Sequence, residues 1–211
     1  MLNTNEWFIV KGGVSEDTCD KIKHLAKGEW EDSSVEVGGA FTDHERTYGR
    51  DREYKTSYSK RKSDVAWTSE QWAYDAIWPY MLRANQESGW RYDVSSAEGM
   101  QITRYREGGF YAFHRDGYGD HLSAYDQPDN KFIDGKVRKL SMTLSLGGEY
   151  EGGDFQFRTY DTNGKCIISS VDIKEKGTMV FFPSYTEHRV TPVTSGIRYS
   201  LVSWFLGPPF V

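Results

Sequence analysis

Apolar residues recur with the period of a helix in two segments of the first third of the chain. In the first segment, over residues 15–26, the apolar positions are 19, 22, 25 and 26, and two acidic residues follow Ser15. A serine hydroxyl can accept from a free N–H group of a first helical turn, and acidic side chains are favoured there. We therefore predict a helix that begins after Ser15 and ends before Gly28.

The second helical pattern is predicted to begin at Thr68, which pairs with Gln71 as a capping box. The apolar residues after it fall on one helical face, at positions 73, 76, 77, 80, 81 and 84. Pro79 interrupts this pattern. Because proline cannot supply the backbone N–H of a helix interior, we expect a kink or two shorter helices at this point.

After residue 98 the pattern becomes that of strands. Short segments rich in β-branched and aromatic residues alternate with glycines, at 100–106, 140–146, 154–158, 166–173, 178–182 and 197–205. Several short strands at this spacing are typical of a β-sandwich or barrel. With no internal repeat, we expect one domain over 1–211, mainly β with N-terminal helices: 1–98 is a helical support region and 99–211 a β core.

Two polar stretches interrupt these elements. Residues 43–64 are densely charged, which favours a solvated loop; the alternative is that its basic residues contact an anionic substrate. Residues 117–138 are too long for a hairpin turn, and we interpret them as a lid over a binding site. Tyr118 and His121 lie in this lid, where we expect His121 to be solvated.

Composition narrows the classes of protein. The chain has 211 residues and a formal net charge of −5, so charge does not favour nucleic acid as a partner. Aromatic residues make up 15%, too many for a disordered chain. There are two cysteines, the first residues do not resemble a signal peptide, and no apolar run has membrane-spanning length. We expect a soluble, cytoplasmic protein without a membrane partner.

Candidate chemistry begins with His114 and Asp116. In an extended segment residues two apart project to the same face, so this imidazole and carboxylate can converge on one ion. His188 follows the apolar strand 178–182 and is expected near the end of a sheet. Two histidines and one carboxylate are the donor set that binds Fe(II) and leaves coordination positions open. A structural zinc site would close four ligands, usually with cysteine.

Arg198 is the next candidate. Alternation along the last strand places it on one face with Ser200, Val202 and Trp204. A cation that faces into a barrel is costly unless it is paired, and the sequence indicates no dedicated acidic partner. A bound dicarboxylate would supply a bidentate contact. The alternative is an ordinary salt bridge to a neighbouring strand.

Four ordered segments carry a more specific resemblance. Residues 101–116, 140–146, 150–154 and 182–193 together resemble the iron- and 2-oxoglutarate-dependent oxygenases of the prolyl 4-hydroxylase-like superfamily, PKHD-type hydroxylases in particular. The resemblance implies a double-stranded β-helix (jelly-roll) core that holds Fe(II) through His114, Asp116 and His188. It also implies that Arg198 grips the distal carboxylate of 2-oxoglutarate.

The same resemblance assigns further residues. Tyr105 matches a tyrosine that helps to hold the distal carboxylate, and Ser141 stands where collagen-type relatives have threonine and could add a weaker hydrogen bond. Tyr111 and Trp204 match aromatic residues that line the pocket around metal and substrate. For the three aromatic residues the alternative is simple core packing.

The activity that the resemblance implies is hydroxylation of an unactivated C–H bond, with 2-oxoglutarate and O2 as co-substrates and ascorbate as an accessory reductant. The implied substrate is a protein or peptide side chain such as proline. The alternatives are a free amino acid or small metabolite, a dioxygenase that ignores 2-oxoglutarate, and a non-catalytic metal-binding jelly-roll module. The sequence leaves the oligomeric state open.

Overall fold

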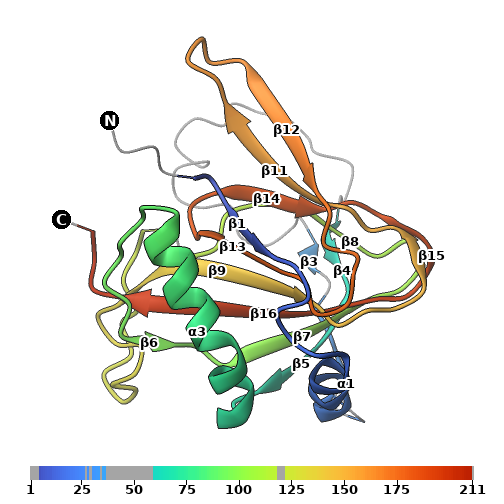
Figure 1. The fold of residues 1–211 in the computed structure, drawn as a ribbon, viewed down its shortest axis with the longest axis horizontal. Coiled ribbons are helices and arrows are strands. Elements are labelled where there is room, and N and C mark those ends of the chain that lie inside the picture. Colours follow the sequence, from blue (N-terminus) through green and yellow to red (C-terminus); the bar gives the residue numbers. More distant parts are fainter. Residues whose placement is uncertain are drawn as a thin grey trace.

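The structure is a computed structural model in which two antiparallel sheets face each other (Figure 1). It describes residues 5–26, 28, 30–33, 35–36, 59–117 and 122–210. The two facing sheets form the predicted double-stranded β-helix, and the mainly β fold class is confirmed.

The larger sheet has eight strands, and its long strand β16 (Arg198–Gly207) pairs with neighbours on both sides. Along the sheet the order is β1 (Phe8–Val10), β13 (Met179–Pro183), β9 (Val137–Ser145), β16, β7 (Met100–Tyr105), β5 (Asp64–Thr68) and β2 (Glu31–Asp32), and β6 (Ser96–Ala97) pairs with the end of β16. The strands predicted within 100–106, 140–146, 178–182 and 197–205 all belong to this sheet.

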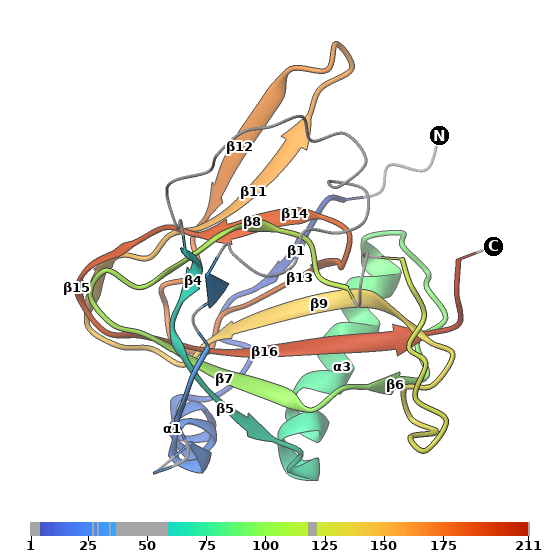
Figure 2. The same ribbon diagram turned by 180° about the vertical axis from the view of Figure 1, so that it is seen from behind.

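The smaller sheet has six strands and carries the two candidate histidines. Its order is β12 (Cys166–Val171), β11 (Phe155–Tyr160), β14 (Glu187–Val190), β8 (Phe110–His114), β4 (Ser59–Lys62) and β3 (Val35–Glu36). A separate pair, β10 (Tyr150–Gly152) and β15 (Val193–Gly196), joins the two sheets at one end. Seen from behind, the β11–β12 hairpin extends beyond the body of the molecule (Figure 2).

Helix α1 (Glu16–Leu25) begins where the sequence predicts, because the backbone N–H of Thr18 donates to the Ser15 hydroxyl at 3.2 Å. Helix α3 (Gln71–Glu87) begins later than predicted: Glu70 is its N-cap residue and no side chain caps it. The Thr68 hydroxyl instead accepts from the Glu70 N–H at 3.3 Å, at the end of β5. The helix continues through Pro79, so the expectation of two shorter helices was wrong.

Two apolar clusters hold these layers together. The first lies between the helices and the outer face of the larger sheet, where Ile77 and Met81 of α3 pack with Leu144 and Phe205. Full burial of one such side chain contributes about 1.5–3 kcal/mol. The second cluster lies between the two sheets and includes Phe155, Phe157, Val180, Phe182 and Val190. The candidate site lies against this second cluster.

Part of the charged segment 43–64 is not a loop. Residues 43–58 lie outside the described residues, but Ser59–Lys62 forms β4 and Asp64 begins β5. Arg61 is 8% exposed because β4 pairs with β8 and turns this side chain inward. For residues 59–64 the solvated-loop interpretation is therefore wrong. The first 98 residues also supply strands of both sheets in addition to the helices.

The segment predicted as a lid is described from residue 122 onward. Tyr125 is buried, its backbone N–H donates to the Lys136 carbonyl at 2.9 Å, and its own carbonyl accepts from the Gly135 N–H at 2.9 Å. These bonds tie the loop to the start of β9. Tyr118 and His121 lie outside the described residues, and a lid role for them stays a prediction. Neither α1 nor α3 is long and apolar enough to span a membrane.

Candidate active site

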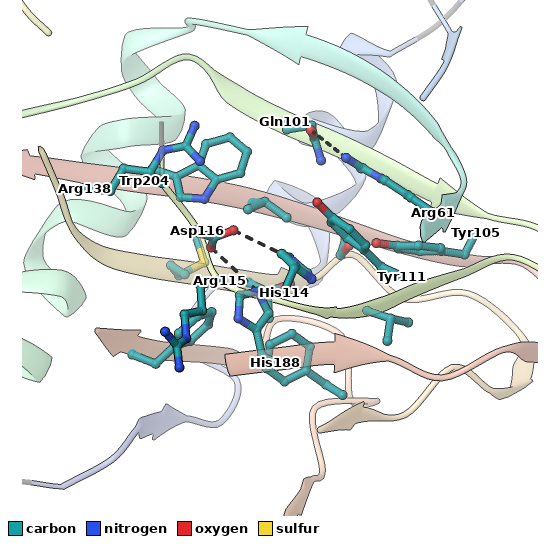
Figure 3. A pocket seen from close by; sticks show the side chains of 18 of the residues that line it. Arg61, Gln101, Tyr105, Tyr111, His114, Arg115, Asp116, Arg138, His188 and Trp204 are labelled. Atoms are coloured by element: carbon teal, nitrogen blue, oxygen red, sulfur yellow. Dashed lines mark hydrogen bonds and ion pairs between the residues drawn. The ribbon is translucent and has the colours of Figure 1, made fainter. Parts of the chain in front are cut away.

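His114 and His188 lie directly opposite each other in the pairing of β8 with β14. Their ring centroids are 4.2 Å apart. Asp116 follows β8, and its backbone N–H donates to the Ser184 carbonyl at 2.9 Å, which fixes its position. Figure 3 shows the three side chains turned toward one another. The Asp116 carboxylate lies 3.6 Å from Nε2 of His114 and 3.7 Å from Nε2 of His188.

Backbone carbonyl groups set the tautomer of both imidazoles. Nδ1 of His114 lies 2.8 Å from the Ala112 carbonyl oxygen, and Nδ1 of His188 lies 2.9 Å from that of Thr186. A carbonyl can only accept, so each Nδ1 carries the proton and donates it. The lone pair of each Nε2 then points to the space beside Asp116. A second hydrogen bond of this kind is characteristic of histidines that bind a metal.

The charges of the cluster also suit a cation. Burial, and after it the neighbouring His188, lower the pKa of His114 to about 3. Burial alone would raise the pKa of the Asp116 carboxyl, but His188, His114 and Arg138 together hold that pKa below its ordinary value. At neutral pH the site therefore presents a neutral His114 and an ionised Asp116.

These three residues fit Fe(II). Their ligand atoms all lie within 4.8 Å of one another, and among the described residues no other group of histidine, cysteine or carboxylate side chains gathers in this way. Two imidazole nitrogens and one carboxylate oxygen leave positions open, as an iron oxygenase site requires. A closed zinc site would need a fourth protein ligand.

Arg198 lies at the other end of the same cavity and is only 2% exposed. It is opposite Tyr105 in the β16–β7 register, and its guanidinium lies 5.4 Å from the Tyr105 ring. Its Nη1 donates to the Ser200 hydroxyl at 3.1 Å. Within the described part of the chain it forms no ion pair, so the salt bridge to a neighbouring strand is not found there.

The cavity between the sheets has a volume of about 260 Å³. It joins the His114–Asp116–His188 cluster to Arg198, and the alternating residues Ser200, Val202 and Trp204 also face it. Its wall also includes Tyr105, Tyr111, Thr143, Phe155, Phe182 and Val190. Most of this wall is apolar, which limits the access of water to the space between the two ends.

Ser141 does not lie where the resemblance placed it. It is fully buried, donates to the Ser184 hydroxyl at 2.9 Å, and helps to lower the pKa of Asp116. In the β9–β16 register it is opposite Trp204, six residues from Arg198 and thus about 20 Å along the strand. Thr143 lies nearer to Arg198 and faces the cavity. The alternation of β9, which puts both residues on one face, is the signal that could have indicated Thr143.

Tyr111 and Trp204 line the cavity beside the cluster. The Tyr111 ring stacks on His114 with centroids 3.5 Å apart, and burial raises the pKa of its hydroxyl to about 12. Trp204 is 7% exposed, and its indole Nε1 is buried without a hydrogen-bond partner among the described residues. The half-exposed Trp67 lies 6.2 Å from the Trp204 ring, at the cavity mouth.

Figure 3 shows three more polar residues of the cavity beside Trp204 and Tyr111, namely Arg138, Gln101 and Arg61. Sequence reasoning missed Arg138 and Gln101, and it considered Arg61 only as one of the basic residues of 43–64 that could contact an anionic substrate. Arg138 makes two hydrogen bonds with Glu98, at 2.6 and 2.5 Å, and lies 4.0 Å from the Trp204 ring. Arg61 lies 4.8 Å from the Tyr111 ring and donates to Gln101 at 3.5 Å. Because Arg61 belongs to a run of charged residues, nothing in its sequence context separates it from a surface cation.

A jelly roll with two histidines and an aspartate between its sheets, and a buried arginine beyond them, defines the class of iron oxygenases that use a keto diacid. The model of the 2OG-Fe(II) oxygenase superfamily matches residues 100–206, which contain all four of these residues. The chain belongs to this superfamily.

Curated relatives agree with this assignment. A PKHD-type hydroxylase of Hyphomonas neptunium is 38% identical over 93 residues, which cover 42% of this chain and 37% of that protein. A PKHD-type hydroxylase of a Synechococcus strain is 29% identical over 199 residues, 90% of this chain and 74% of that protein. The match to the Hyphomonas neptunium protein therefore spans little more than a third of that protein's length.

Solved structures share the fold at low sequence identity. A viral collagen prolyl hydroxylase from Paramecium Bursaria Chlorella virus-1, in complex with 2-oxoglutarate, has a TM-score of 0.61 and 18% identity, covering 98% of this chain and 99% of that one. A Pseudomonas putida prolyl-4-hydroxylase has a TM-score of 0.59 and 19% identity, covering 97% and 94%. A Trichoplax adhaerens prolyl hydroxylase, in complex with a peptide fragment, has a TM-score of 0.54 and 18% identity, covering 97% and 84%.

Proposed function

We propose that this protein is an Fe(II)- and 2-oxoglutarate-dependent dioxygenase that hydroxylates an unactivated C–H bond in a protein or peptide side chain, with proline as the leading candidate. One observation carries the proposal. A cluster that fits Fe(II) and a buried arginine without an ion-pair partner in the described chain line one cavity.

In this proposal His114, Asp116 and His188 hold the metal, which supplies O2 activation coupled to decarboxylation of 2-oxoglutarate. Arg198 binds the distal carboxylate of the co-substrate through its guanidinium, because a buried cation is stabilised by a bidentate anion. Tyr105, opposite Arg198, and Thr143 supply hydroxyl groups on the same wall. Ascorbate serves as the accessory reductant that keeps the iron ferrous.

The rest of the chain orients the reactants and excludes water. The rings of Phe155 and Phe182 lie 5.5 and 4.6 Å from the His188 ring, so they cover the cluster on the side of the second apolar core. The substrate enters at the mouth beside Trp67 and Trp204. There the indole N–H of Trp204, which is buried and has no partner among the described residues, can donate to an acceptor such as a peptide carbonyl once the ring shifts toward the substrate.

A peptide substrate is supported by the names of the similar structures, which include prolyl hydroxylases and one complex with a peptide fragment. We therefore favour a peptide over a free amino acid.

The test is a succinate assay with the protein, Fe(II), 2-oxoglutarate, O2 and ascorbate, with and without proline-containing peptides. We expect slow succinate formation without peptide and faster formation with a substrate, together with a +16 Da peptide product in mass spectrometry. His114→Ala should abolish both signals. Absence of succinate from the metal-loaded wild type, with every peptide and with a host-cell extract, would favour the non-catalytic module.

A further inference from the structure

The β12 strand is an open edge of the smaller sheet. It belongs to the β11–β12 hairpin, which extends beyond the body of the molecule in both views (Figures 1 and 2). Ile167 and Ile168 point to opposite faces of this strand, yet they are 42% and 49% exposed. Neither face of the outer half of the hairpin is therefore covered by the described part of the chain.

The hydrogen bonds of the hairpin show which backbone N–H and carbonyl groups of β12 point away from β11, toward the unpaired edge of the sheet. The Asp161 N–H donates to the Lys165 carbonyl at 3.0 Å, so this pair is a hydrogen-bonded position of the ladder. By alternation, Ile167 and Ser169 also direct their N–H and carbonyl groups toward β11. Cys166, Ile168 and Ser170 direct theirs to the open edge, where the described chain offers them no backbone partner.

This edge lacks the features that usually protect an edge strand. Natural edges are short, charged, bulged or interrupted by proline. The described edge strands β1, β2 and β3 have only three, two and two residues. By contrast, β12 has six residues, pairs with β11 without a bulge, and contains no charge and no proline. A long, uncharged and regular edge is a template for another strand.

We propose that two copies of this chain associate by antiparallel pairing of their β12 strands about a two-fold axis at Ile168. In this register Cys166 of one copy faces Ser170 of the second copy, so the three open residues of each strand all find partners and exchange about six backbone hydrogen bonds. Pairing about a two-fold axis is the commonest mode of self-association in proteins.

The charge pattern fits a second copy in this orientation. The exposed Lys165 precedes β12 and the exposed Asp172 follows it. Antiparallel pairing brings the lysine end of each strand to the aspartate end of the other, whereas parallel pairing would place like charges together. The uncharged strand between them adds no repulsion, and the exposed parts of Ile167 and Ile168 become partly covered on both faces.

The test is the mass of the protein in solution, measured by sedimentation equilibrium under reducing conditions so that Cys166 cannot form a disulfide. We expect a concentration-dependent species of twice the 24.3 kDa chain mass. Ile168→Lys, which places two ammonium groups opposite each other at the axis, should weaken the dimer at least tenfold. Asn163→Lys, at the exposed hairpin turn, is the matched control and should leave it nearly unchanged.

A second variant separates the edge from the fold of the hairpin. Ile168→Pro removes an N–H that points away from β11, so it should dissociate the dimer while the circular dichroism spectrum and the metal affinity stay as in the wild type. Amide exchange gives the register directly: Ile168 and Ser170 should be protected only in the dimer, and Ile167 and Ser169 also in the monomer. A monomer at all concentrations, or a dimer that both Ile168 variants leave intact, would overturn the proposal.

Discussion

Arg198 lies directly opposite Tyr105 in the register of β16 with β7, and both side chains face the cavity that holds His114, Asp116 and His188. The arginine is 2% exposed, and its one side-chain hydrogen bond within the described residues goes to a neutral hydroxyl, that of Ser200. A buried guanidinium in this state favours an anionic ligand, because removal from water is costly for a cation that stays unpaired.

Arg198→Ala should therefore weaken 2-oxoglutarate binding. Truncation of one partner of a buried charge pair costs about 2–5 kcal/mol, which corresponds to a rise in apparent KM of about 30-fold or more. Arg198→Lys keeps the charge but loses the bidentate contact, so its KM should lie between that of the wild type and that of Arg198→Ala. Initial rates of succinate formation at varied 2-oxoglutarate give these values. The control is Arg83→Ala, whose side chain is 55% exposed on α3. Equal KM values in all three variants would mean that Arg198 does not bind 2-oxoglutarate.

Asp116→Asn should remove the only anionic ligand of the proposed metal set. We expect the affinity for Mn(II), a redox-inert substitute for Fe(II), to fall by more than about 100-fold, since even the loss of groups that only support a ligand costs about 10–100-fold. Isothermal titration calorimetry under argon measures this affinity. His24→Ala, on the exposed end of α1, should bind Mn(II) like the wild type. Retention of the wild-type affinity in Asp116→Asn would remove this residue from the ligand set.

Much of this site follows from short-range sequence patterns. The spacing of His114 and Asp116 brings them to the same face of one extended segment. Alternation along β16 brings Arg198 and Trp204 to the same face of that strand, and all four residues line the cavity. Which strands pair cannot be found in this way, because pairing depends on contacts between residues far apart in the chain. The β14–β8 register that brings His188 to His114 is of this kind.

The errors have physical causes. Ser141 matched a family position, but its place in the β9–β16 register puts it beside Asp116 and far from Arg198. Arg61 lies in a charged run whose composition indicates a loop, yet pairing with β8 forms a strand there and buries the side chain. Thr68 has the sequence of a helix cap, but β5 extends through it and α3 begins three residues later. For Arg61 and Thr68, a long-range contact outweighs the local preference.

Trp204→Phe tests the indole N–H that has no partner in the described residues. The change removes no intramolecular hydrogen bond but leaves some empty space beside Arg138, so the free energy of unfolding should fall by about 0.5–3 kcal/mol, as for most single substitutions. If the N–H donates to the substrate, the apparent KM for the peptide should rise by about tenfold, as expected for one hydrogen bond. The rate of succinate formation without peptide should stay the same. A wild-type KM in this variant would assign Trp204 to packing alone.

The metal-free protein should lose stability in acid. Burial holds the pKa of His114 at about 3, below the ordinary value of 6.5. Between these values the unfolded chain binds a proton that the folded chain does not bind, so the free energy of unfolding rises with pH over this range and is lost as the pH falls. The lowered pKa of Asp116 acts in the same direction at more acidic pH. Urea unfolding with a chelator present should give a shallower pH dependence in His114→Gln, and an equal slope would place the proton uptake elsewhere.

Two glycines with almost the same backbone conformation give a matched test of how the chain positions Arg198. Gly196 and Gly164 have φ of +77° and +75°. Alanine at either position destabilises the fold by about 1–2 kcal/mol, because its Cβ disfavours the left-handed conformation. A Cβ on Gly164 meets open space, whereas one on Gly196 would collide with the Glu149 carbonyl oxygen and lie 3.1 Å from Cα of Tyr150.

Gly196→Ala should therefore lower the free energy of unfolding by about 1–3 kcal/mol more than Gly164→Ala, the usual range for a side chain that does not fit. Because Gly196 lies two residues before Arg198, the backbone shift that relieves the collision should also displace the guanidinium and raise the apparent KM for 2-oxoglutarate. Gly164→Ala, at the turn of the β11–β12 hairpin, should leave that KM unchanged. Urea denaturation and succinate kinetics on the two variants measure both effects. If Gly196→Ala and Gly164→Ala had equal free energies of unfolding and equal KM values, the β10–β15 contact would not hold Arg198 in place.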